Sequence, residues 1–101
     1  MRARILRGAH EIGGSCVELE HEGSRIVLDL GRPLTAGWDD DVPLPEVLGL
    51  ATGDDPGLLG VILSHGHADH WGLVPLLPAS VPRYCGRATA DILRAASFWG
   101  L

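Results

Sequence analysis

The feature that most constrains how this chain can fold is a short apolar segment that runs directly into a cluster of histidines. Residues 60–64 (Gly-Val-Ile-Leu-Ser) have the length and character of a strand that is covered on both faces. The next six residues are His65-Gly66-His67-Ala68-Asp69-His70. Loops at strand ends are common places for reactive groups. We therefore expect a buried strand that leads into a functional loop.

The segments on either side of this loop predict an α+β fold. Apolar periodicity predicts strands at 3–7, 15–21 and 24–30, with a tight turn at Glu22-Gly23, and therefore a β-meander. The β-loop-α units that follow consist of the strand at 60–64 with a short helix at 71–77, and a strand at 81–85 with a helix at 88–99. Ala88, Ile92, Ala96 and Trp99 line one side of the last helix.

Residues 31–56 predict a long loop, because they hold four prolines and six of the thirteen acidic residues. A loop of this length is a substrate-side loop or a plain surface excursion, and the sequence leaves both readings open. Residues 45–50 could form a short helical turn within it.

Length, charge and cysteine content limit the classes of protein to which this chain can belong. The 101 residues are enough for one small domain, and their formal net charge is −5, with eight arginines and no lysine. A basic patch for nucleic acid is therefore not predicted. Cys16 and Cys85 form no metal-binding pair and are expected to be reduced and buried. No apolar run is long enough to span a membrane, so we expect a cytoplasmic protein.

The histidine cluster has the residue types of a metal centre. In an extended backbone His65 and His67 point to the same side and can share one ion. Asp69 and His70 project differently and can serve a second ion. Imidazole and carboxylate suit zinc, with manganese or iron as alternatives. Two ions about 3.5–4 Å apart can activate a bridging water near neutral pH.

Each candidate also has a simpler interpretation. The histidines could be surface residues, and Asp69 could cap a helix that begins at Trp71. Asp29 could orient a ligand histidine, or it could be an ordinary aspartate at the end of a strand. His10 lies in a glycine-rich turn and is more typical of a turn residue than of a ligand.

These residues give the chain a resemblance to the metallo-β-lactamase superfamily. The cluster at 65–70 matches its HxHxDH motif, and residues 26–31 (Ile-Val-Leu-Asp-Leu-Gly) resemble its earlier strand ending in Asp-Gly. Residues 8–16 and 64–77 are similar to the β-CASP and ribonuclease J-like branch.

The resemblance implies an αββα sandwich with a dinuclear zinc site. His65 and His67 would bind the first ion, and Asp69 and His70 the second. Asp69 and Asp29 would be the catalytic carboxylates, with Asp29 supporting the site. The implied reaction is hydrolysis of a phosphodiester, in RNA or in a small molecule.

The family pattern also needs a histidine, an aspartate and a last histidine further downstream. After His70 the chain has no histidine, and Asp91 is its only carboxylate. We therefore expect residues 1–101 to be a partial domain, the N-terminal half of the sandwich with the C-terminal half absent. Such a chain would be weakly active or inactive alone, and would pair with a complementing C-terminal chain or form a homodimer.

Two alternatives remain open. One is a metallo-hydrolase of the same fold that acts on thioesters or lactones. The other is a non-catalytic remnant or interaction module, which would use an exposed strand edge and an uncovered apolar face to bind another chain.

Overall fold

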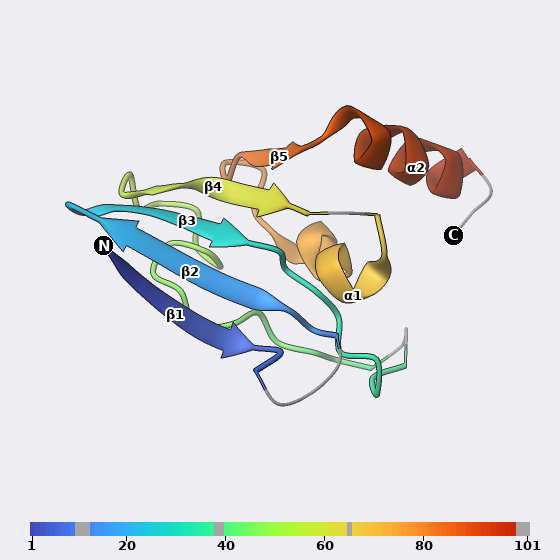
Figure 1. Cartoon of the computed structure of the whole chain (residues 1–101), viewed down its shortest axis with the longest axis horizontal. Coiled ribbons are helices and arrows are strands. Elements are labelled where there is room, and N and C mark those ends of the chain that lie inside the picture. Colours follow the sequence, from blue (N-terminus) through green and yellow to red (C-terminus); the bar gives the residue numbers. More distant parts are fainter. Residues whose placement is uncertain (10–12, 38–39, 65, 99–101) are drawn as a thin grey trace.

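The fold is a five-stranded mixed sheet with helices at one end (Figure 1). The computed structural model describes residues 1–9, 13–37, 40–64 and 66–98, with the backbone alone at 68, 69 and 96–98. The strands follow one another across the sheet in sequence order. They are β1 (Arg2–Arg7), β2 (Cys16–His21), β3 (Ser24–Leu28), β4 (Leu58–Leu63) and β5 (Arg83–Cys85). The helices are α1 (Ala68–Trp71), the 3-10 helix η1 (Val74–Leu76) and α2 (Arg87–Phe98).

The predicted α+β class is confirmed. Strands β1, β2 and β3 form an antiparallel meander, and β4 and β5 join it in parallel. The turn between β2 and β3 places Glu22 at φ 50° and Gly23 at φ 84°. Two consecutive positive φ values match the right-handed twist of a tight hairpin.

Some predicted boundaries are wrong. The helix expected at 71–77 is divided: α1 begins earlier, at Ala68, and η1 follows with Pro75 in its first turn. Proline supplies no N–H, so it cannot continue an α-helix from the preceding turn. Strand β3 ends at Leu28 because Asp29 turns to φ 62°. Residues 45–50 form turns and no helix.

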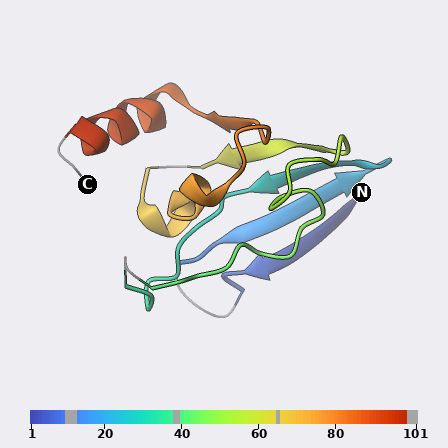
Figure 2. The ribbon, with the colours of Figure 1, turned by 180° about the vertical axis from the view of Figure 1, so that it is seen from behind.

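One face of the sheet is covered. Glu18, Val27 and Val61 form a cross-strand row on this face, and each is almost fully buried. Residues 42–57 of the long segment between β3 and β4 pass over it, and α1 and η1 lie at the end of the strands (Figure 2). Val47 and Leu50 of the long segment are buried in the core. This part of the loop is therefore a core-forming cover and not a plain surface excursion.

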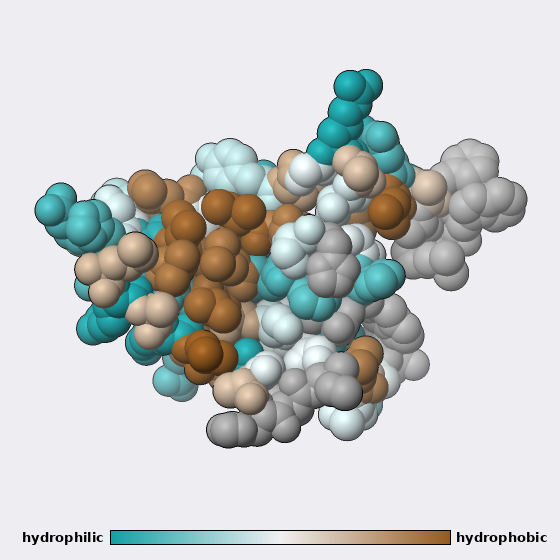
Figure 3. Space-filling model, in the orientation of Figure 1, coloured by the Kyte–Doolittle hydropathy of each residue, from teal (hydrophilic) through white to brown (hydrophobic). Residues whose placement is uncertain are grey.

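The other face of the sheet is apolar and open. Ile5, Val17, Leu28 and Ile62 are cross-strand neighbours along one row, and Ile5 is 63% exposed. Figure 3 shows the resulting hydrophobic patch over the strands. The expectation that the strand at 60–64 is covered on both faces is wrong, because Ile62 is 37% exposed and nothing described covers it.

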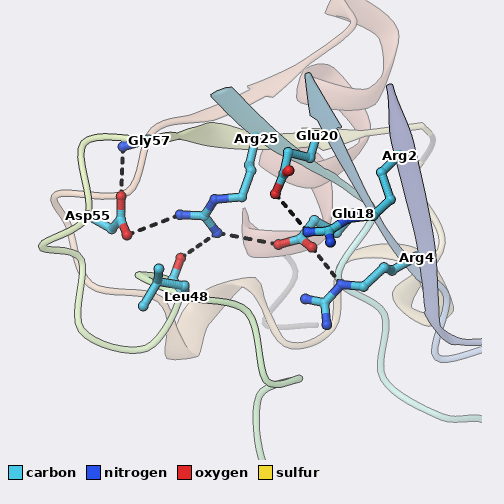
Figure 4. A network of polar contacts seen from close by, with 8 residues as sticks. All are labelled: Arg2, Arg4, Glu18, Glu20, Arg25, Leu48, Asp55 and Gly57. Carbon is cyan, nitrogen blue, oxygen red and sulfur yellow. Dashed lines mark hydrogen bonds and ion pairs between the residues drawn. The ribbon is translucent and has the colours of Figure 1, made fainter. Parts of the chain in front are cut away.

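Buried charges tie the covered face together (Figure 4). Arg25 pairs with Glu18 at 3.3 Å and with Asp55 at 3.3 Å, and donates to the Leu48 carbonyl at 2.8 Å. Arg4 donates to the other oxygen of Glu18 at 2.7 Å. Burial alone would raise the pKa of Glu18, but hydrogen bonds and charges from the two arginines outweigh it and lower that pKa. Glu18 can therefore occupy a core position as an anion.

The last helix, α2, does not pack against the sheet through the predicted face that contains Ala88 and Ile92. Thr89 is buried and Leu93 packs against the core, whereas Ala88 and Ile92 are exposed.

Among the described residues, no helix is both long and apolar enough to cross a membrane.

Both cysteines are free thiols, as predicted. The expectation that both are buried is wrong for Cys85, which lies exposed on the edge strand β5.

Candidate metal centre

The site is built where two neighbouring parallel strands end. Asp29 follows β3 and Ser64 follows β4, so both residues lie at the same edge of the sheet. The Asp29 N–H donates to the Ile62 carbonyl at 2.9 Å, which extends the strand ladder by one bond. Asp29 then accepts from Ser64 twice, from the backbone N–H on Oδ1 and from the hydroxyl on Oδ2, each at 2.7 Å. The carboxylate thus joins the two strand ends.

Asp29 also holds His70. The His70 Nδ1–H donates to Asp29 Oδ2 at 2.7 Å, and the imidazole is 20% exposed whereas Asp29 is buried. Two backbone bonds fix α1 beside the strand end: Leu30 N–H to the His70 carbonyl at 2.9 Å, and Leu73 N–H to the Leu30 carbonyl at 3.0 Å. Leu30 and Leu73 are fully buried. The position of the His70 ring is therefore set by the core.

The described residues include only part of the predicted ligand set. His67 is exposed, and its carbonyl accepts the His70 N–H at 2.9 Å. His65, the Asp69 side chain and His10 lie outside the described residues. Within the described part of the chain, no group of three or more His, Cys, Asp or Glu side chains could hold an ion. Asp69 lies inside α1, so the alternative of a cap for a helix beginning at Trp71 is wrong.

The donors that are described nevertheless fit a metal by their chemistry. An ionised carboxylate only accepts hydrogen bonds, so Asp29 requires the proton of His70 to be on Nδ1. The lone pair is then on Nε2, which is the arrangement found at most histidine metal ligands. Cys16 is fully buried, and burial raises the pKa of its thiol to about 11.

Sequence reasoning missed two residues of this site. Ser64 donates to Asp29 through its backbone N–H and through its hydroxyl, and a hydroxyl residue ending an apolar strand was the available signal. Trp71 donates its indole N–H to the Gly66 carbonyl at 2.8 Å. No local pattern in the sequence pairs these two residues.

Comparison with known proteins places the chain in a family. The family model described as the metallo-beta-lactamase superfamily matches residues 11–82. An RNase J-like protein of Methanocaldococcus jannaschii is 36% identical over 86 residues, which are 85% of this chain and 18% of that protein. The transcription termination factor FttA of Methanosarcina mazei is 37% identical over 100 residues, covering 92% of this chain and 15% of the relative.

A bacterial relative shows the same similarity. Ribonuclease J of Mycobacterium tuberculosis is 34% identical over 80 residues, which are 76% of this chain and 14% of that enzyme. The chain thus spans less than a fifth of the length of these relatives. The family match covers both Asp29 and the histidine cluster. The chain belongs to the metallo-β-lactamase superfamily, in its β-CASP and ribonuclease J-like branch.

Proposed function

We propose that this chain contributes part of the active site of a metal-dependent hydrolase that cleaves phosphodiesters, with RNA as the substrate class. The observation that carries the proposal is the 2.7 Å contact between His70 Nδ1 and Asp29 Oδ2, which puts the proton on Nδ1 and makes Nε2 the atom that would bind an ion. Members of this superfamily generally bind divalent metals such as zinc.

The proposed ligands are those of the motif. His65 and His67 would hold one ion, and Asp69 and His70 the other, with zinc as the first choice and manganese or iron as alternatives. When bound, the ions would supply an acidified water as nucleophile and positive charge to stabilise the transition state. Asp29 would act as a positioning residue, because both of its oxygens accept from protein donors and it is 8% exposed.

The substrate class rests on the relatives. Two of those named above are ribonucleases or RNase J-like by name, which favours a phosphodiester over a thioester or a lactone. The charge of the chain does not add to this, since the net charge is −5 and Arg2 and Arg4 are already paired with Glu20 and Glu18. Affinity for RNA would therefore come from bound cations and from regions outside these 101 residues.

A substrate panel with metal controls tests the proposal. Bis(p-nitrophenyl) phosphate, a short RNA and a set of thioesters and lactones would be incubated with the chain and zinc or manganese. We expect slow, metal-dependent cleavage of the phosphodiesters, lost in His70→Ala and kept in Asp91→Asn, whose carboxylate lies exposed on α2. Turnover of thioesters in preference to phosphodiesters would contradict the proposed substrate class. Cleavage that survives His70→Ala would contradict the proposed site.

The open sheet face supports a second proposal, that this surface packs against a complementing chain or a second copy. Leu19, Ile26 and Leu59 line an apolar hollow there, and Leu59 is 50% exposed. Apolar patches of this kind mark interaction surfaces. Light scattering would test it: Leu59→Lys should reduce self-association. Leu48→Lys should not, because Leu48 lies on the covered side of the sheet, where its carbonyl accepts from Arg25. A wild-type chain that is monomeric at high concentration would exclude the homodimer.

A further inference from the structure

The Gly66 peptide lies between two predicted metal ligands and is held by a residue that the motif does not contain. The Trp71 indole N–H donates to the Gly66 carbonyl at 2.8 Å. Trp71 is the last residue of α1 and packs against the core. The His70 carbonyl in α1 and the N–H of Leu73, just after α1, both bond to Leu30, which follows β3, so the indole is fixed relative to the sheet.

Ile92 of α2 limits the space beside Gly66 for a side chain. A Cβ at Gly66 would lie 2.9 Å from Ile92 Cγ2 and 3.3 Å from Ile92 Cβ. Gly66 has no positive φ, so the glycine is needed for space and not for its backbone conformation. Ile92 cannot easily turn aside, since a β-branched residue in a helix has one strongly preferred χ1 rotamer. Buried Thr89 and the packed Leu93 fix α2 itself.

We propose that Trp71 and Ile92 are positioning residues that clamp the Gly66 peptide and so preset the neighbouring His67 for metal. This inference rests on the proposed metal site. A flexible backbone between two ligands must be ordered when the ion binds, and that ordering weakens binding. A peptide held from both sides is already ordered, so removing either contact should weaken metal affinity without unfolding the chain.

Replacing one atom tests the Trp71 contact. Trp71 would be replaced by 3-benzothienylalanine, which keeps the shape of indole but has sulfur in place of the N–H. Zinc affinity would be measured by competition with a chromophoric chelator, with Tyr84→Phe as a control because Tyr84 is exposed on β5. We expect zinc binding about tenfold weaker for the isostere, the lower end of the effect of residues that orient metal ligands, and unchanged for the control. An isostere that binds zinc as the wild type does would overturn the role of Trp71.

Two single variants test the Ile92 contact. Gly66→Ala should weaken zinc binding about tenfold because its methyl group would meet Ile92, and Ile92→Ala should weaken it about tenfold because the contact beside Gly66 is lost. A zinc affinity that is unchanged in Ile92→Ala would overturn the role of Ile92. Thermal unfolding of the metal-free variants separates a loss of positioning from a loss of folding.

The same variants distinguish failure of the clamp from failure of the metal site. If the wild-type chain binds no zinc, the proposed metal site is wrong. The clamp is then tested in the metal-free chain by the amide resonances of Gly66 and His67. These should shift or broaden when Trp71 is replaced by its isostere and stay unchanged in Tyr84→Phe. Unchanged resonances in the isostere would overturn the clamp as well.

Discussion

Replacing Asp29 by asparagine should impair the proposed metal site while leaving the backbone intact. Asparagine tolerates the left-handed conformation of this position, φ 62°, as well as aspartate does. Its amide oxygen can keep the bond from the Ser64 N–H, now 2.7 Å long. Its NH₂ group, however, would face His70 Nδ1, where the carboxylate now accepts at 2.7 Å. Two donors cannot pair, so His70 would move its proton to Nε2.

The size of this effect follows from the lost hydrogen bond. For His70 to bind an ion through Nε2, the proton must return to Nδ1 and face the amide N–H. That costs about 1.5–3 kcal/mol, the value of a hydrogen bond to a charged group. Since about 1.4 kcal/mol is a factor of ten, zinc affinity should fall roughly 10- to 100-fold.

Asp55→Asn is the matched control. Asp55 also accepts a backbone N–H at 2.7 Å, from Gly57, and its other oxygen pairs with a side chain, Arg25, at 3.3 Å. It lies on the loop before β4, away from the histidines, so this variant should bind zinc as the wild type does.

Zinc competition and long-range ¹H–¹⁵N correlation spectra of the imidazoles would read out both variants. The metal-free wild type should show His70 with its proton on Nδ1, and Asp29→Asn should show it on Nε2. A wild-type His70 protonated on Nε2 would contradict the proposed tautomer, and an Asp29→Asn variant with undiminished zinc affinity would contradict the positioning role of Asp29.

Three further predictions concern the scaffold. Arg25→Met should lower the free energy of unfolding in urea by about 3 kcal/mol, because it leaves buried Glu18 with one partner. Arg2→Met, at an exposed pair, should lower it by about 1 kcal/mol or less, and equal losses in the two variants would contradict a buried network. The pKa of Glu18 is lowered in the folded state, so its ionised carboxylate stabilises the fold above the ordinary pKa of 4.5, and this stabilisation is lost as the pH falls through the lowered pKa. Glu18→Gln should therefore reduce the loss of unfolding free energy at acid pH, and an unchanged loss would contradict the role of Glu18. At pH 8 a thiol reagent should modify Cys85 rapidly and Cys16 only on unfolding, since Cys16 is buried and its thiol pKa is about 11. Rapid modification of both cysteines in the folded chain would contradict the burial of Cys16.

Much of the fold could be predicted because local patterns agree with it. The alternation in 15–21 and the Glu22-Gly23 turn specify the meander, and the structure follows both. Which side chains of β2 face the core was harder to predict from the sequence. Cys16 and Glu18 face the core while Val17 and Leu19 are partly exposed, which reverses the usual preference. Only Arg25 and Arg4, which approach Glu18 from neighbouring strands, make this arrangement stable, and period-two patterns contain no such information.

The candidate site divides in the same way. Asp29 was predicted to support a ligand histidine, and the structure pairs it with His70 across 41 residues of sequence. The roles of Ser64 and Trp71 depend on hydrogen bonds that exist only once β3, β4 and α1 are packed together. The ligand assignments of His65, His67 and Asp69 remain predictions. The division of the helix expected at 71–77 could have been inferred from Pro75.

The proposed metal site requires that His70, held by Asp29, binds an ion through Nε2 together with its neighbours in the motif. A crystal of the chain grown with zinc, with anomalous diffraction recorded on both sides of the zinc edge, tests it most directly. We expect an anomalous peak within coordination distance of His70 Nε2, with the Asp29 contact to Nδ1 intact and other motif side chains around the same centre. Zinc bound elsewhere, or bound through Nδ1 with Asp29 displaced, would contradict it.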